Sequence, residues 1–466
     1  MQVVTIGQKI WGANVQPGFF DICLMTTYFI VIYLIIKLIE NKNRLKNPAY
    51  NYFSIGFLIK VFMSQAICIV YTYVYSGGDS TAYYVSAEKM GELAFDNSYG
   101  YFRILMGSIG YENFSEYGLP TWFDWPFRFD DQSSWVVVRL TSLFTIIGFK
   151  NYFTTSLLLS IFSYFGTWKL FLLLNRLYPG KSKQLAIAFL FIPSVAFWGS
   201  GILKDTYTYS AICWFMFCFY KIFIDRSKFA SNLIGLFIAI YIIIIIKPYI
   251  LVALLPGCFL WFSHSWYMRG KTGFMRFATL PLILVIALFV NIFIISTVRK
   301  NLGEYGTIEG ILNKAVATQM DLKNDFYGGE SFNIGEFDAN IGSVIAKVPE
   351  GLIAGLYRPF LWEAKNPLML LSAIENLFLL ILLFYVLIKI SLKKSIKIVI
   401  ANPYLFFTLS FSLFLAFSIG LTSSNFGSLV RYKIPIIPFY VSGLFLLIGI
   451  AKDKKNEKKL NDKNLL

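Results

Sequence analysis

Histidine and charged side chains are scarce in this sequence. His264 is the only histidine, and charged residues make up 15% of the 466 positions. We place His264 at a cytoplasmic helix end, so a Ser-His-Asp or histidine-metal site on the outer side is not expected. No Walker A loop occurs, which argues against direct ATP hydrolysis. The five cysteines all fall within apolar runs and predict neither a disulfide framework nor a metal motif.

Apolar residues are abundant instead. Hydrophobic residues make up 57% and aromatic residues 18% of the chain, above ordinary globular usage, so the excess must face lipid. Three of the apolar runs extend from Phe19 to Ile39, from Ala278 to Ile295 and from Pro367 to Ile390. At about 1.5 Å per residue, each can cross roughly 30 Å of hydrocarbon as a helix, which satisfies the backbone there. The sequence therefore predicts an all-α, polytopic transmembrane helical bundle.

The net charge of +16 comes from short basic clusters between the apolar runs rather than from one basic surface. We interpret the clusters as topology signals and not as a nucleic-acid site, because cytoplasmic loops retain Lys and Arg. Every second loop is basic, which predicts about eleven spans with the N-terminus outside and the C-terminus inside. One tilted helix through 231–264 is the alternative to two short spans, and it breaks this alternation. The expected spans lie near residues 18–39, 53–75, 152–175, 185–201, 206–224, 231–247, 249–264, 277–297, 367–389, 402–422 and 433–451.

The predicted organisation is a single transmembrane domain, residues 1–451, followed by a basic cytoplasmic tail, residues 452–466, that anionic lipid can touch. Two large loops are expected outside, at about 76–151 and 298–366. The apolar run from Trp135 to Phe149 has Arg139 in its middle, and we expect it to lie along the membrane interface. The first external loop therefore contains interfacial helices in this prediction. Five aromatic residues precede the run, and they are Trp122, Phe123, Trp125, Phe127 and Phe129.

The first candidate for chemistry is Asp79, which follows the second expected span within Ser-Gly-Gly-Asp. The two glycines allow a sharp turn that presents the carboxylate at the membrane boundary, with Tyr83 and Tyr84 one turn further on as candidate pocket residues. Partial burial there would strengthen Asp79 as a general base toward an acceptor hydroxyl. The structural alternative is that Asp79 only caps the helix beginning near Ser80.

Two lysines come next, each in a short turn expected on the outer side. Lys204 stands beside Asp205, for which capping of the following helix is the favoured role. Lys247 precedes Pro248 in a tight turn between two apolar helices. Each lysine is interpreted either as a phosphate ligand or as a side chain that extends to the interface.

A further group closes the second external loop. Arg358 is a candidate for holding an anion with two hydrogen bonds, and Glu363 is a candidate for pairing with a cation. Trp362 is interpreted either as a stacking surface for a sugar or, with preference, as part of the aromatic belt.

The last group opens the final span. Arg431 and Lys433 are two cations on the side where positive charge is disfavoured, so a diphosphate or a carboxylate such as Asp79, Glu363 or Glu375 should compensate them. Glu375, about two turns into an apolar helix, is expected to face the bundle interior as a hydrogen-bonding group or a pocket wall.

No cofactor is predicted with certainty. Asp124, Asp130 and Asp131 offer carboxylates for a divalent cation, although acidic loop residues are more often solvated. No metal ligand set is assigned.

Four of these segments together resemble the membrane-embedded GT-C superfamily, and within it the bacterial relatives of the dolichyl-phosphate-mannose protein mannosyltransferases. They are the motif Gly77-Gly78-Asp79 with Tyr83 and Tyr84, the amphipathic first external loop, the stretch from Pro193 to Asp205, and Arg431-Tyr432 before Pro435 and Pro438. The sequence departs from the family in having one acidic residue in the early motif where many members have two. It also has no soluble C-terminal domain after the last expected span.

The resemblance implies a glycosyltransferase of the bacterial inner membrane with its site facing the periplasm or outside. Such an enzyme transfers a sugar from a polyprenyl-phosphate donor to a glycan, lipid or protein acceptor. Asp79 would be the catalytic base, and Arg431, Lys433, Lys204, Lys247 and Arg358 would be the candidates for the donor phosphate.

Two other functions compete with this expectation. An O-antigen or capsule repeat-unit polymerase has similar spans and external arginines but uses an oligosaccharide on a diphosphate lipid. A transporter or lipid flippase favours ionisable residues near mid-membrane and internal repeats, and no repeat is apparent in this sequence.

Overall fold

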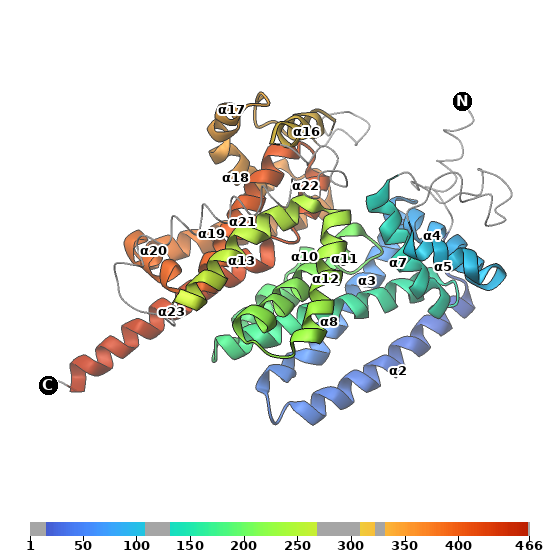
Figure 1. Ribbon diagram of the computed structural model, residues 1–466, viewed down its shortest axis with the longest axis horizontal. Helices are drawn as coiled ribbons and strands as arrows, with labels where there is room; N and C mark the ends of the chain where they lie inside the picture. Colours follow the sequence, from blue (N-terminus) through green and yellow to red (C-terminus); the bar gives the residue numbers. More distant parts are fainter. Residues whose placement is uncertain (1–14, 108–130, 268–307, 322–330, 465–466) are drawn as a thin grey trace. The chain divides into compact units, whose positions relative to one another are not determined.

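The chain is helical wherever its structure is described. The computed structural model describes residues 15–107, 131–267, 308–321 and 331–464 (Figure 1). Within these ranges helices alternate with turns, and the single bridge between extended segments joins Ser331 to Asn425. The predicted all-α class is therefore confirmed for this part of the chain.

Within the described residues, seven helices are long and apolar enough to cross a membrane. Pro48–Val74 combines η1 (Pro48–Tyr52), α3 (Phe53–Ile69) and η2 (Val70–Val74), and Lys204–Ile224 combines α11 (Lys204–Phe219) with η5 (Tyr220–Ile224). An eighth span is possible if α22 (Phe426–Tyr432) and α23 (Ile437–Asn464), bent by 58°, act as one. A membrane protein with several spans is thus confirmed, while the count of eleven and the orientation stay predictions. Besides Pro48–Val74 and Lys204–Ile224, the seven candidate spans are α2 (Phe19–Asn43), α8 (Tyr152–Leu177), α12 (Phe229–Ile246), α19 (Pro367–Lys389) and α21 (Pro403–Thr422).

One of the expected spans is interrupted, and another lies outside the described residues. The segment expected at 185–201 is interrupted between α9 with η4 (Ser182–Ala186, Ile187–Phe191) and α10 (Pro193–Trp198). Ile192 is extended there, with φ −68° and ψ 122°, because a residue before proline disfavours helical geometry. The helix expected at 249–264 is present as α13 (Pro248–Tyr267). The span expected at 277–297 falls in undescribed sequence.

The chain forms two compact units. Unit 1 comprises residues 1–177, 195–217 and 234–247, and unit 2 comprises 178–194, 218–233 and 248–466. In unit 1, α2, α3 and α8 pack against one another, and α4 (Asp79–Asp96) and α5 (Ser98–Met106) pack on α7 (Gln132–Ile147). Side chains 135–138 of α7 are buried in the same core as Tyr83 and Tyr84. The helix expected along the membrane interface is thus covered by protein over this stretch.

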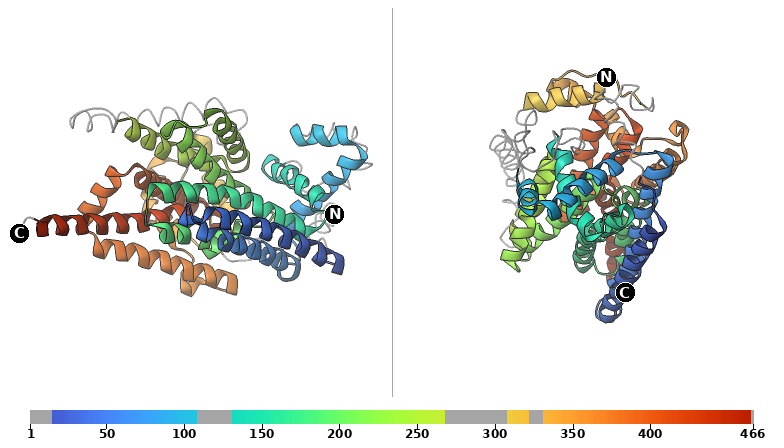
Figure 2. Two further views of the ribbon diagram at one scale, coloured as in Figure 1. Left: turned by 90° about the horizontal axis from the view of Figure 1, so that it is seen from below. Right: turned by 90° about the vertical axis from the view of Figure 1, so that its right-hand side faces the viewer.

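Unit 2 is organised around α21, which packs against α13, α16 (Ile308–Asp321), α18 (Val348–Tyr357) and α23 (Figure 2). The contact with α18 brings backbone against backbone. A Cβ atom on Gly355 would lie 1.9 Å from the carbonyl oxygen of Ala416, and one on Gly420 would lie 1.9 Å from that of Gly351. Glycine at both positions is therefore what allows the two helices to approach so closely.

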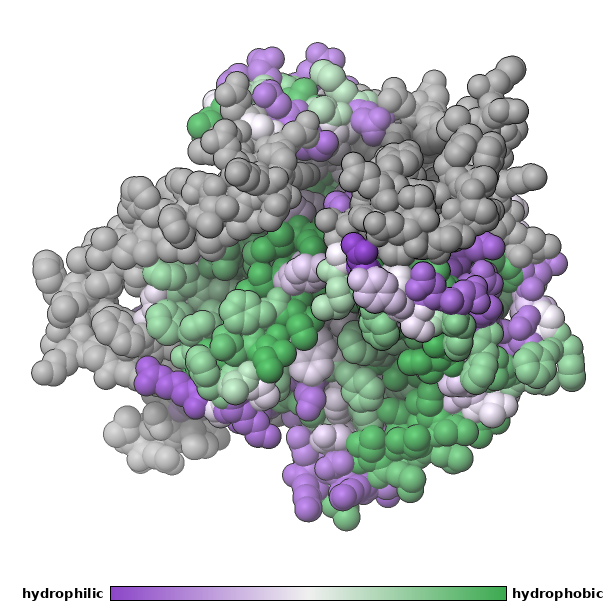
Figure 3. Space-filling view, turned by 45° about the vertical axis from the view of Figure 1, so that its right-hand side comes forward, coloured by the Kyte–Doolittle hydropathy of each residue, from purple (hydrophilic) through white to green (hydrophobic). Residues whose placement is uncertain are grey.

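Large apolar side chains remain exposed on several long helices. Only 6% of the apolar window of α2 and 28% of that of α19 is buried by the rest of the chain. Hydrophobic side chains cover broad continuous areas of the surface seen in Figure 3, and hydrophilic side chains gather in smaller groups. Such exposure is what a lipid-facing surface requires, and it exceeds what a soluble domain normally shows.

Candidate functional site

Asp79 stands at the start of α4, immediately after a tight turn. Ser76, Gly77 and Gly78 have φ angles of 52°, 127° and 130°, and a Cβ on Gly78 would lie 2.9 Å from the ring of Tyr71. The sharp turn predicted from the two glycines is therefore confirmed. The N-cap residue of α4 is Gly78, and Asp79 is the first helical residue. Asp79 therefore does not occupy the capping position that the structural alternative assigned to it. The carboxylate lies in the first turn, where the helix dipole favours negative charge.

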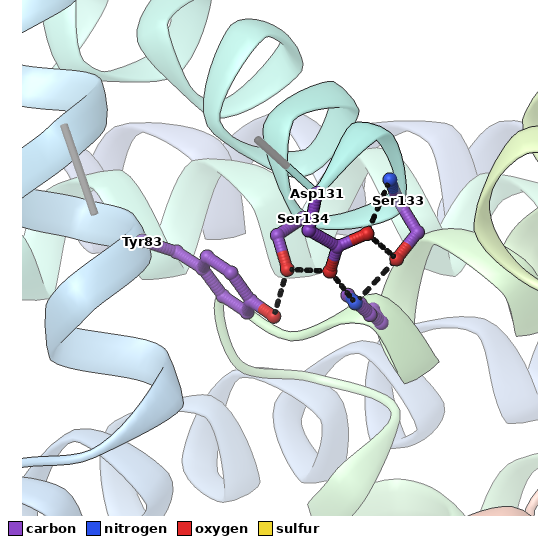
Figure 4. Close-up of polar contacts among 5 residues, drawn as sticks. Tyr83, Asp131, Ser133 and Ser134 are labelled. Atoms are coloured by element: carbon purple, nitrogen blue, oxygen red, sulfur yellow. Dashed lines mark hydrogen bonds and ion pairs between the residues drawn. The ribbon is translucent and has the colours of Figure 1, made fainter. Parts of the chain in front are cut away.

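A network of polar side chains forms at the N-terminus of α7, close to that of α11 (Figure 4). Asp131 is the N-cap of α7 and accepts hydrogen bonds from the amide and hydroxyl of Ser133, at 3.0 and 2.7 Å. It also accepts from the hydroxyl of Ser134 at 2.6 Å. The ammonium of Lys204, the first residue of α11, donates to Asp131 at 3.0 Å and to the hydroxyl of Ser133 at 2.6 Å.

Tyr83 joins this network to α4. Its hydroxyl lies 3.3 Å from that of Ser134, whose proton is directed to Asp131, so Tyr83 is the donor in this contact (Figure 4). Residues four apart on a helix share a face, and Tyr83 follows Asp79 by four positions. Asp79 therefore lies on the face of α4 that carries Tyr83 toward α7. The N-termini of α7 and α11 and the side chain of Tyr83 from α4 thus contribute to one polar cluster within unit 1.

Asp131 is charged at neutral pH. Its partial burial raises the pKa of the carboxyl, but the ammonium of Lys204 and the hydroxyls of Ser134 and Ser133 outweigh burial and hold the pKa well below its usual range. The pair with Lys204 is thus a true ion pair, in which 39% of the Asp131 side chain and 19% of the Lys204 side chain stay exposed.

The partnership of Asp131 with Lys204 was missed from the sequence. Asp131 was considered only as a metal ligand beside Asp124 and Asp130, which lie outside the described residues. Among the described residues no group of three or more His, Cys, Asp or Glu side chains is placed to hold a metal. The pattern Asp131-Gln-Ser133-Ser134 before an apolar run is a helix N-terminus signal, and it could have identified the cap although not its partner.

The turn before Lys204 is attached to α3. Lys60, a buried lysine of α3, donates to the carbonyl of Gly199 and lies 5.9 Å from the centre of the Tyr209 ring. Two residues on, a Cβ on Gly201 would lie 2.5 Å from the side chain of Ile67. The same helix α3 continues through η2 to the turn before Asp79. One rigid element thus positions the starts of both α4 and α11.

Lys247 and Asp205 form a buried ion pair in unit 1. The ammonium of Lys247 lies 2.5 Å from the carboxylate of Asp205, and their side chains are 7% and 1% exposed. Lys247 therefore does not extend to the membrane interface, which was one of its two interpretations. As a phosphate ligand it would first have to leave Asp205.

Tyr84 has a structural role at the base of the same unit. Its hydroxyl donates to the carbonyl of Lys150 at 2.6 Å and lies 3.1 Å from Glu88, and its ring packs against Tyr152. Burial, followed by the charge of Glu88, raises the pKa of Tyr84, so the hydroxyl stays neutral. These contacts leave Tyr83 as the tyrosine nearer to the candidate site.

In unit 2, Arg358 is held by a carboxylate and by aromatic rings. Its Nε donates to Glu363 at 2.9 Å, its Nη2 donates to the same carboxylate, and its guanidinium lies 4.7 Å from the centre of the Phe332 ring. The predicted pairing of Glu363 with a cation is confirmed for Arg358. Trp362 is 81% exposed and stacks on Phe360 with ring centres 4.8 Å apart, so its indole is accessible for a sugar or for lipid head groups.

Lys433 and Glu375 are internal hydrogen-bonding groups in unit 2. Lys433, 2% exposed, donates to the carbonyl of Arg358 and to the side-chain oxygen of Asn376 at 3.2 Å. Glu375 accepts from the amide and hydroxyl of Ser194, at 3.0 and 2.5 Å. The interior position expected for Glu375 is therefore confirmed. Arg431, in the last turn of α22, is partly exposed.

The candidate residues are thus divided between the two units. Unit 1 contains Asp79, Tyr83, Tyr84, Lys204 and Lys247, where Asp131 joins them. The six candidates in unit 2 are Arg358, Trp362, Glu363, Glu375, Arg431 and Lys433. The fold and the site define an α-helical membrane protein with a polar cluster at helix N-termini. No family model, curated protein or solved structure matches the chain.

Proposed function

We propose that the chain is a membrane-embedded glycosyltransferase of the GT-C type. It moves a sugar from a polyprenyl-phosphate donor to a glycan, lipid or protein acceptor on the non-cytoplasmic side of a bacterial inner membrane. The observation that carries the proposal is the cluster in unit 1, where Asp79 lies on the face of α4 that reaches Asp131 and Lys204 through Tyr83 and Ser134. The proposal assigns the base to Asp79 and the cation to Lys204, because sugar transfer from a lipid phosphate needs a base and a cation.

In the proposed reaction Asp79 takes the proton of the acceptor hydroxyl. The hydroxyl oxygen then forms a bond to the anomeric carbon of the donor sugar, and the bond from that carbon to the phosphate oxygen breaks. The phosphate leaves with the electron pair and with the polyprenyl chain. A lipid phosphate needs no strong acid to leave, but a nearby cation lowers the barrier by stabilising the developing negative charge.

Lys204 is the cation best suited to that role in unit 1. An ammonium has three N–H donors, and Asp131 and Ser133 accept from it while 19% of its side chain stays exposed. A donor N–H therefore remains for a phosphate oxygen in this proposal. Lys247 is less suitable because its partner is buried, and Lys433 is less suitable because it is 2% exposed.

The decisive substitution is Asp79→Asn, with Asp96→Asn as the matched control. Both aspartates belong to α4, and Asp96 is its exposed last residue. The sugar is first identified from cell-surface glycans of a deletion strain, and purified protein in liposomes is then assayed with polyprenyl-phosphate sugars. We expect D79N to lose at least about a hundredfold in transfer rate, as removal of a general base does, and D96N to keep it. Full activity in D79N with normal folding would remove the base assignment.

The repeat-unit polymerase is tested in the same liposomes. It would use an oligosaccharide on a diphosphate lipid in place of a monophosphate sugar. Chain elongation with the diphosphate donor, and no transfer from the monophosphate donor, would replace the proposed donor class while keeping the role of Asp79.

A lipid flippase is the second candidate function, and Lys60 is the observation that favours it. This lysine is buried within the candidate span Pro48–Val74, and intramembrane cations often serve translocation. Its contact with the Gly199 carbonyl also supports a purely structural role. Movement of a labelled polyprenyl-phosphate lipid across liposomes without an acceptor, abolished by Lys60→Met, would support the flippase and contradict the transferase.

A further inference from the structure

Helix α20 (Leu392–Ala401) lies between two candidate spans. Ile390 and Ser391 separate it from α19, and Asn402 separates it from α21. A connection this short leaves a ten-residue helix no room to leave the membrane boundary, because a span ends on each side of it. Helix α20 packs against α21 and α23 within unit 2. The surface of α20 that does not contact α21 or α23 faces the surroundings of the protein at the membrane boundary.

The side chains of α20 fall into three sectors around the helix axis. Ser395 and Ile398 are buried against the protein. The next sector is apolar and exposed, and it consists of Leu392, Ile396 and Ile400, at 64%, 50% and 50%. At about 100° per residue these three occupy one stripe, because they are four positions apart. The third sector, beyond the stripe, consists of the exposed lysines Lys393, Lys394 and Lys397.

We infer that α20 is an interfacial helix whose lysines bind the head groups of anionic phospholipids. The apolar stripe inserts at the boundary of the acyl chains, and the lysines beside it lie at the level of the phosphates. Exposed Lys389 at the end of α19 adds to the same basic group. This inference concerns unit 2 alone and does not depend on the proposed sugar transfer.

Charge and continuity both favour lipid over a protein partner. Between Glu375 and Asp453 the sequence contains no acidic residue, so no neighbour along the chain neutralises the lysines. The last turns of α19 expose Phe384, Leu387 and Ile388, and the apolar stripe of α20 follows them within the same connection. A lipid-facing surface therefore ends at a basic one, which is the arrangement that an anionic membrane surface attracts.

Hydrogen exchange of the α20 amides tests the inference on the full chain in nanodiscs. The discs contain phosphatidylcholine with or without phosphatidylglycerol. We expect phosphatidylglycerol to slow exchange in α20, and K393Q/K394Q/K397Q to abolish that effect, because each lysine near an anionic surface contributes about fivefold in affinity. The apolar variant L392S/I396S/I400S should exchange faster in both lipids. High salt should remove the lipid dependence of the unsubstituted protein, since exposed charges are screened.

The matched control is K452Q/K454Q/K455Q at the start of the tail. It removes the same charge from exposed lysines of α23 that have no apolar stripe beside them. This variant should keep the lipid-dependent slowing in α20. Equal exchange in both lipids, a response that survives high salt, or an equal loss in the tail variant would each overturn the inference.

Discussion

The ion pair between Asp131 and Lys204 is the contact whose removal is most informative. Asp131 accepts four hydrogen bonds, one of them from Lys204, and also caps α7. Asp131→Asn keeps a good N-cap residue but removes the negative charge. Asp131→Ala removes both. The two variants therefore separate the contribution of the ion pair from that of the cap.

The expected loss of stability is modest because the pair is partly exposed. With 39% of Asp131 and 19% of Lys204 accessible, solvent screens the charges, and we expect D131N to lower the free energy of unfolding by about 1 kcal/mol. D131A should lose about 1 kcal/mol more, the usual value of a helix cap. If Lys204 also holds the donor phosphate, both variants should raise the KM for the donor more than they lower kcat.

The stabilisation that Asp131 contributes depends on pH, and the direction follows from the shift of its pKa. Because Lys204 and the serines hold the pKa of Asp131 below its usual range, its stabilising contribution is present above the unfolded value of about 4 and disappears as the pH falls through the folded value. Thermal unfolding in detergent should therefore show the largest difference between the unsubstituted protein and D131N near neutral pH. Equal unfolding temperatures there, or a difference that persists in strong acid, would refute this account.

Two further substitutions test packing and burial. Asp205→Ala leaves Lys247 buried without its carboxylate and should cost about 3 to 5 kcal/mol, whereas the double variant D205N/K247M should recover most of that loss in thermal unfolding. Gly355→Ala places a Cβ 1.9 Å from a backbone oxygen of α21 and should lower the unfolding temperature strongly, while Gly342→Ala, with 3.5 Å to its nearest atom, should not. Unfolding temperatures that do not distinguish the two alanine variants would contradict the close packing of α18 on α21.

The sequence predicted the helical class and most of the long spans because apolar runs of sufficient length leave the backbone one economical structure. It also predicted the turn before Asp79, since two adjacent glycines permit backbone angles that other residues avoid. The pairing of Glu363 with Arg358, five positions away, was predictable, but partners far apart in the sequence were not. Lys204 and Asp131 are 73 positions apart, and Lys433 and Asn376 are 57 apart. Helical periodicity shows which face of a helix is apolar, but it does not show which helix lies beside it.

The glycine contact between α18 and α21 has a mechanical consequence. Where two backbones touch, no layer of side chains can slide or change rotamer to absorb a displacement. Arg358 follows α18 directly, and its carbonyl accepts from Lys433 just beyond α22. A force applied at Arg358 is therefore passed to α21 as the movement of one stiff body, so a ligand pulling on this arginine would tilt the helix pair together.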